Sequence, residues 1–72
     1  MEKMVNLVLV AADEIMDSGR VVLAGRRADH ILHVLKKKKG QTLKVGVVNG
    51  KLGTGTIREL TKDSVTLDGV FD

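Results

Sequence analysis

The side chains with the most evident chemical potential in this chain are basic and are concentrated in its middle. Three arginines, two histidines and four lysines gather there, namely Arg20, Arg26, Arg27, His30, His33 and Lys36–Lys39. Between Arg20 and Lys39 seven Lys and Arg face one acid, Asp29, so this segment carries 7 − 1 = +6. The other residues hold five bases and eight acids, or −3, which gives the net charge of +3. Such an uneven distribution indicates a surface that meets an anionic partner.

Four of these side chains are spaced to share one face of a helix. At ~100° per residue, Arg26, His30, His33 and Lys37 project from one side. The opposite side carries an apolar stripe with the spacing i, i+3, i+4 and i+7, formed by Ala28, Ile31, Leu32 and Leu35. One face of the helix should therefore pack on a sheet, and the other should be cationic.

This cationic face suits phosphate groups, because arginine donates bidentate hydrogen bonds and lysine acts as a point charge. Charged helix faces also occur simply as solvated surface, but six basic residues with one intervening acid are unbalanced for that role. We therefore predict an RNA-binding set, consisting of Arg20, Arg26, Arg27, His30, His33, Lys36 and Lys37.

Other chemistry finds little support in the residue types. His30 and His33 could share a zinc ion only with a third ligand, and only scattered carboxylates such as Asp29 are available. The glycines between Gly50 and Gly55 lack the Lys-Ser/Thr ending and the following helix of a phosphate-binding loop. There is no Cys or Tyr, and Ser18 stands outside any catalytic motif. We expect no catalytic residue, no metal and no cofactor in this chain.

The composition limits the kind of protein that this chain can be. Seventy-two residues allow one domain, which we assign to 1–72. The absence of Cys removes disulfides and thiolate metal sites, so we expect a cytoplasmic location. With Phe71 as the single aromatic residue, base stacking on aromatic rings is not available and contacts with RNA must be mainly electrostatic. The apolar start, Met1–Val10, is read as a strand, and no apolar run reaches the ~18 residues of a membrane span, so no membrane partner is expected.

The elements that must position the basic residues follow from periodicity and turn signals. Five short strands are expected, at Val5–Val10, Arg20–Leu23, Gln41–Val48, Lys51–Leu60 and Ser64–Leu67. The first is apolar enough for both of its faces to be covered. One helix should begin at Gly25 and end with Gly40 in the left-handed position, and Asn49-Gly50 should form a hairpin turn. Because an open sheet of this size would leave too many free edges, we predict a mainly β (α+β) fold with one helix, a closed or nearly closed small barrel.

The same segments resemble a known family. Gly19-Arg20-Val21, Gly25, Ala28, His30-Ile31, Val34-Leu35-Lys36 and Gly40 are similar to the N-terminal PUA-like domain of the RsmE family of ribosomal RNA methyltransferases. Asn49-Gly50 matches the family's Asp-Gly hairpin, and Thr56-Ile57 through Val65-Thr66-Leu67 resembles its closing strands. Three positions depart from the pattern: Ala24 replaces a frequent serine, Lys36 an arginine and Gln41 an aspartate. Lysine at position 36 weakens bidentate phosphate recognition there.

The resemblance implies a role within a larger, two-domain enzyme. In that family a C-terminal SPOUT domain binds S-adenosylmethionine, forms a homodimer and methylates a ring nitrogen of a uridine in small-subunit ribosomal RNA. The PUA-like domain then positions the RNA, which is a proximity contribution to catalysis. The chain would thus be a non-catalytic fragment that ends at a domain boundary, with ribosomal RNA and its own catalytic domain as partners.

A second hypothesis comes from a different functional class. The basic face could instead dock on the chain's own catalytic domain or on a partner subunit, a role that suits a small core and a chain that stops directly after a strand. An autonomous enzyme has no supporting constellation of residues.

Overall fold

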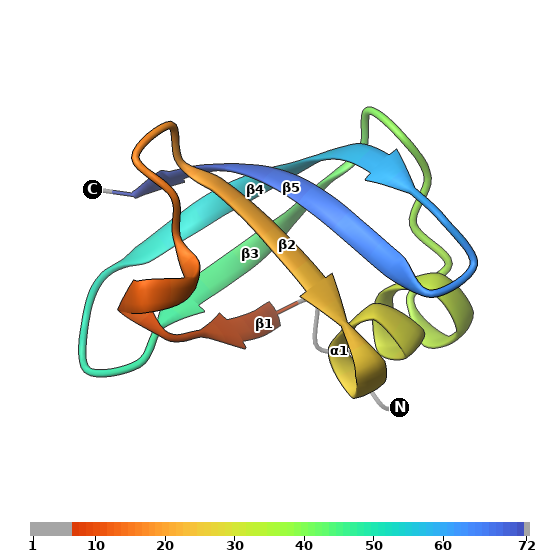
Figure 1. The fold of residues 1–72 in the computed structure, drawn as a ribbon, viewed down its shortest axis with the longest axis horizontal. Coiled ribbons are helices and arrows are strands. Elements are labelled where there is room, and N and C mark those ends of the chain that lie inside the picture. Colours follow the sequence, from red (N-terminus) through yellow and green to blue (C-terminus); the bar gives the residue numbers. More distant parts are fainter. Residues whose placement is uncertain (1–6, 72) are drawn as a thin grey trace, which may run out of the picture.

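The computed structural model describes residues 7–71 and contains one curled five-stranded sheet, a helical segment packed against it and a single 3-10 turn at Ala12–Glu14 (Figure 1). The strands are β1 (Leu7–Val10), β2 (Arg20–Ala24), β3 (Thr42–Val47), β4 (Leu52–Leu60) and β5 (Ser64–Phe71). Their order in the sheet is β1-β3-β4-β5-β2, with β1 parallel to β3 and all other neighbours antiparallel. The sheet forms a half-barrel whose edges are β1 and β2, which confirms the mainly β fold with one helix.

The interior of the half-barrel is filled by alternating residues of all five strands. β2 and β5 illustrate the period of two: Val21, Leu23, Val65 and Leu67 are fully buried and their neighbours face outward. Strand β1 departs from the prediction, because Leu9 is 56% exposed and only one face of the strand is covered. The reason is its edge position, where no second layer lies over its outer face. The predicted strand residues Val5 and Asn6 lie outside the described part of the chain.

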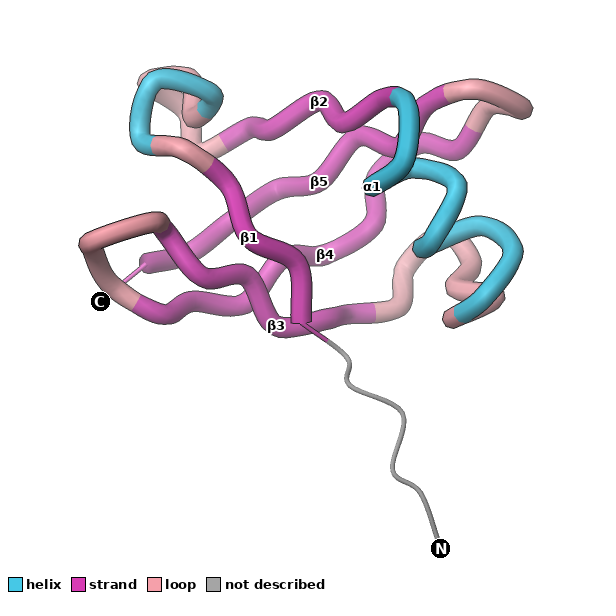
Figure 2. Tube along the Cα trace, turned by 90° about the horizontal axis from the view of Figure 1, so that it is seen from below, coloured by secondary structure: helices cyan, strands magenta, loops and turns pink. Residues whose placement is uncertain are grey.

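The helical segment covers the open side of the half-barrel (Figure 2). It consists of α1 (Gly25–Asp29) followed by a wider π turn, His30–Val34. Its predicted apolar stripe is confirmed: Ala28 and Ile31 are buried, and Leu32 and Leu35 pack against the core from half-buried positions. These contacts hold the segment on the sheet.

The helix ends earlier than its sequence predicts. Leu35 N donates to the carbonyl of His30, and Lys37 N donates to the carbonyl of Ile31 at 3.1 Å. The second bond spans one residue more than a usual helix-ending bond, as expected directly after a π turn. Lys36, with φ 53°, takes the left-handed position that ends the helix, which was predicted for Gly40.

Gly40 has a different role, in the loop that follows. It does have a positive φ, of 89°, but it lies in a separate turn closed by the bond from Gln41 N to the carbonyl of Lys38. The four lysines therefore leave the helix and extend along a loop toward β3. The hairpin between β3 and β4 does form around Asn49, whose φ is 58°.

No helix within residues 7–71 is long and apolar enough to cross a membrane.

Candidate nucleic-acid interface

Among the basic side chains, Arg27 connects the two edges of the half-barrel. One of its terminal nitrogens donates to the carbonyl oxygen of Leu9 on β1, at 3.1 Å, and to Glu14 Oε1, at 2.7 Å. The other nitrogen pairs with Glu14 Oε2, and Ala11 N also donates to Oε1. Arg27 lies in α1, the helix that follows β2, so this network connects the two strands that form the edges of the sheet. We call Arg27 and Glu14 the edge clasp.

The hydrogen bonds of the edge clasp shift the pKa values of both of its members. The hydrogen bonds from Arg27 and from Ala11 N lower the pKa of Glu14 from 4.5 to about 2. The bond to Glu14 raises the pKa of Arg27 further above its ordinary value. Since its guanidinium is already committed to a carboxylate and a carbonyl, Arg27 has little capacity left for a phosphate. The geometry therefore gives this member of the predicted RNA-binding set a structural role.

Two further members of the predicted set lie beside acids. Arg20 Nε is 3.7 Å from Asp68 Oδ1, on the outer face of the sheet. His33 Nε2 is 3.5 Å from Asp29 Oδ1, and both of those side chains are largely exposed. An exposed pair of this kind is worth little and exchanges readily with another anion. His33 is thus paired but accessible, while the Arg20 side chain is 40% exposed and its Nε forms no hydrogen bond among the described residues.

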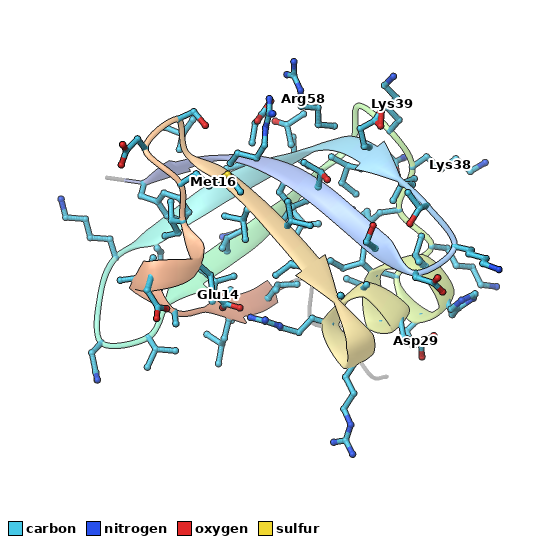
Figure 3. All side chains as sticks on the ribbon, in the orientation of Figure 1. Glu14, Met16, Asp29, Lys38, Lys39 and Arg58 are labelled. Carbon is cyan, nitrogen blue, oxygen red and sulfur yellow. The ribbon has the colours of Figure 1, made fainter. Side chains whose placement is uncertain are left out.

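The remaining predicted residues form no ion pair within the part of the chain that the structure describes. Arg26 and Lys36 are exposed, and His30 and Lys37 are half-buried. Lys38 and Lys39 extend the series, and Figure 3 shows their side chains directed outward from the loop that follows the helix. We call Arg26, at the start of the helical segment, together with Lys36–Lys39, after its end, the helix-end cluster. It contains five cations that no described carboxylate neutralises.

The histidine beside this cluster opens onto a groove between the helix and β1. This groove has a volume of about 520 Å³, and its lining includes Arg26, His30 and Val34 from the helix and Leu7 and Leu9 from the strand. Lys37 does not line the groove, because the chain has already left the helix at that point. The single cationic face inferred from a regular helix is therefore divided in two: a helical part and a lysine loop.

A comparison with protein-family models gives a match over residues 23–68, to the RNA methyltransferase PUA domain. This range includes the helix, the helix-end cluster and most of the sheet. The chain belongs to this family. It is therefore a PUA domain of the type found in RNA methyltransferases, and the predicted relation to a PUA-like domain of this class is confirmed.

The fold has a counterpart among solved structures. The crystal structure of a hypothetical protein superposes with a TM-score of 0.77 at 15% sequence identity, over 89% of this chain. The chain spans 27% of the length of that structure. At this identity the likeness concerns the fold alone. The search of curated proteins gives no match.

Sequence reasoning missed one basic residue that the fold makes prominent. Arg58 lies at a β-bulge of β4, where the pairing with β5 shifts between Ile57 and Glu59. A regular alternation after the buried Ile57 would point Glu59 inward and Leu60 outward, whereas the bulge does the reverse. In the sequence, a charged residue at the position expected to face inward, followed by an apolar residue, was the available sign of this bulge.

Within residues 7–71 no three His, Cys, Asp or Glu residues gather as a metal site would require.

Proposed function

We propose that this domain holds small-subunit ribosomal RNA so that a uridine reaches the active site of its parent enzyme. The parent is proposed to be a cytoplasmic homodimer whose C-terminal SPOUT domain uses S-adenosylmethionine to methylate a ring nitrogen of that uridine. The family match and the sequence resemblance support this proposal. The observation that carries the RNA-contacting role is the helix-end cluster, with five cations free of carboxylate partners among the described residues.

The geometry supports contact with phosphates more than readout of bases. Lysines on a loop are point charges that can follow a phosphate backbone without a fixed geometry. Arg26 adds one planar guanidinium at the other end of the helix, and His30 adds a ring in the groove beside it. Contacts of this type fix the orientation of an RNA, while a catalytic domain selects the base.

Charge reversal in the helix-end cluster tests the proposal. Arg26→Glu combined with Lys37→Glu should weaken binding to a small-subunit ribosomal RNA fragment by at least about tenfold, since each lost charge-assisted contact is worth ~1.5 kcal/mol or more. Lys51→Glu, on the exposed hairpin loop, is the matched control and should bind as the wild type does. If the double variant bound the RNA fragment as tightly as the wild type and Lys51→Glu do, the proposal would be wrong.

The alternative role, docking on the catalytic domain or a partner subunit, predicts a different result. Mixing the domain with its catalytic domain in the absence of RNA should then give a stable complex in gel filtration. The same charge reversal should abolish that complex and leave RNA binding unchanged. The RNA-binding proposal predicts the opposite pattern.

A further inference from the structure

Two arginines lie together on the outer face of the sheet: Arg20, which belongs to the predicted RNA-binding set, and Arg58, which does not. A groove of about 900 Å³ crosses β2, β5 and β4 there. Its lining includes Met16, Arg20, Lys39, Arg58, Thr66 and Asp68. The groove is separate from the one beside His30 and has no residue in common with it.

The arginines in this groove hold more hydrogen-bond donors than their partner can accept. Arg58 donates to Asp68 Oδ2 at 2.7 Å, and Arg20 Nε lies 3.7 Å from the other oxygen of the same carboxylate. Arg20 Nε is buried and has no hydrogen-bond partner among the described residues. One carboxylate thus serves two guanidinium groups, and a buried donor is left without an acceptor. The remaining terminal nitrogens of the two arginines, whose side chains are 40% and 55% exposed, stay open to a further anion.

The bulge in β4 directs side chains into the groove. Because Arg58 is the additional residue of β4 at this point, it and Glu59 both face outward and both line the groove. Bulges often re-aim a side chain next to a functional site. Lys39 reaches the same face from the loop after the helix, and Figure 3 shows its side chain and that of Arg58 projecting from one edge of the molecule.

The charges and the apolar floor favour one kind of ligand. Three cations, Arg20, Lys39 and Arg58, outnumber the two acids of the groove, Glu59 and Asp68. Two apolar side chains, Met16 and Val22, are about half exposed at its floor. A nucleotide combines an anionic phosphate with an apolar base face, whereas an acidic peptide offers charge without that face.

We propose that this groove is a second RNA subsite, which binds a single-stranded nucleotide that follows the helix-end cluster. Its phosphate accepts hydrogen bonds from Arg20 and Arg58, and its base packs on Met16 and Val22. Lys39 belongs to both surfaces and connects them. This inference rests on the proposed RNA-binding function and assigns to it a further contact surface.

The test uses the 72-residue chain and a short single-stranded oligouridylate as the probe. Arg58→Gln should weaken binding about tenfold, the effect of one charge-assisted contact. Met16→Ala should weaken it to a smaller extent, because it removes a packing surface and no charge. Lys51→Glu, on the hairpin between β3 and β4, is the control and should have no effect. In the wild type, addition of oligouridylate should shift the NMR signal of the Arg20 Nε–H group.

The outcomes separate this inference from the proposed function. If Arg58→Gln and Met16→Ala bind as the wild type does while Arg26→Glu with Lys37→Glu loses affinity, the groove is not a subsite and the RNA-binding function stands. If none of these variants changes binding, both are wrong. Equal competition by polyglutamate for the groove would also overturn the inference, because the surface would then select charge alone. Thermal melting of each variant shows that the fold is intact, as expected for exposed side chains.

Discussion

At the scale of single residues, whether a basic side chain is paired or free depends on its distance from an acidic side chain. Arg27 lies in the densest basic segment of the sequence, yet Glu14, thirteen residues earlier, engages both of its terminal nitrogens. Arg26, its neighbour, points to solvent and pairs with no described acid. No periodicity argument could separate these two, because the partner belongs to the short turn after β1, and only the closure of the half-barrel brings it close.

The edge clasp predicts a specific dependence of stability on pH. The folded-state pKa of Glu14 lies at about 2, below its ordinary value of 4.5. A depressed carboxylate pKa contributes stability that is present above pH 4.5 and is lost as the pH falls toward 2. Glu14→Gln should therefore lower the melting temperature at neutral pH, and the gap from the wild type should close across this window. A gap that stays constant down to pH 2 would show that the clasp does not act through charge.

A second prediction at this scale concerns Lys36, which adopts a left-handed conformation with φ 53°. A non-glycine residue in this conformation is strained by ~1 kcal/mol, and replacing it with glycine removes that strain. Part of the gain is lost, because glycine has more conformational freedom in the unfolded chain. Lys36→Gly should thus raise the free energy of unfolding by up to ~1 kcal/mol, while RNA affinity falls because a cation is lost. Urea denaturation and RNA titration of the same variant check both effects. If Lys36→Gly had a lower free energy of unfolding than Lys36→Ala, the left-handed conformation assigned to position 36 would be wrong.

At the scale of elements, the sequence predicts whether a segment is a helix or a strand better than it predicts the residues at which that element ends. The strands, the hairpin and the apolar stripe of the helix follow from periods of two and 3.6 and from turn residues. The π turn and the early helix end could not be predicted, since both depend on how Leu32 and Leu35 reach the core. The bulge in β4 is similar: it is a property of the pairing between two strands, although Glu59 before Leu60 hints at it.

Close packing between strand ends gives a prediction for Gly53, on β4. A Cβ atom at this position would lie 2.3 Å from the carbonyl oxygen of Val70 and 2.6 Å from a ring carbon of Phe71, both on β5. Gly53→Ala should therefore destabilise the domain by ~1–3 kcal/mol, because backbone must move to admit a methyl group. Thr54→Ala, at the neighbouring exposed position, should cost less than this. Denaturant unfolding of both variants makes the comparison, and equal stabilities would contradict the register of β4 with β5.

At the scale of the whole molecule, the half-barrel separates an apolar core from a charged surface. The fully buried side chains are apolar and lie between the sheet and the helical segment, and no described charged residue is buried. The sequence predicts the fold class and the concentration of positive charge. It does not predict which cations remain free, because ion pairs such as that of Arg58 with Asp68 join residues ten positions apart across strands.

The core gives the matching prediction at this scale. Ile31 is fully buried in the core cluster, where the helical segment and the strands meet. Ile31→Ala should reduce the free energy of unfolding by ~2–5 kcal/mol, a large share of the stability of so small a domain. RNA affinity, measured where the variant is still folded, should change far less than stability. A loss of affinity as large as that of the helix-end variant would mean that the cluster needs a rigid helix to bind.

The most direct test of the central claim is the dependence of RNA affinity on salt concentration. With about five phosphates neutralised by the helix-end cluster, the logarithm of the affinity should fall against the logarithm of the salt concentration with a slope of roughly −3.5 to −4.5. Arg26→Glu with Lys37→Glu should reduce the magnitude of this slope by about two units. A wild-type slope near zero would contradict the account, because the free cations would then contact no phosphate.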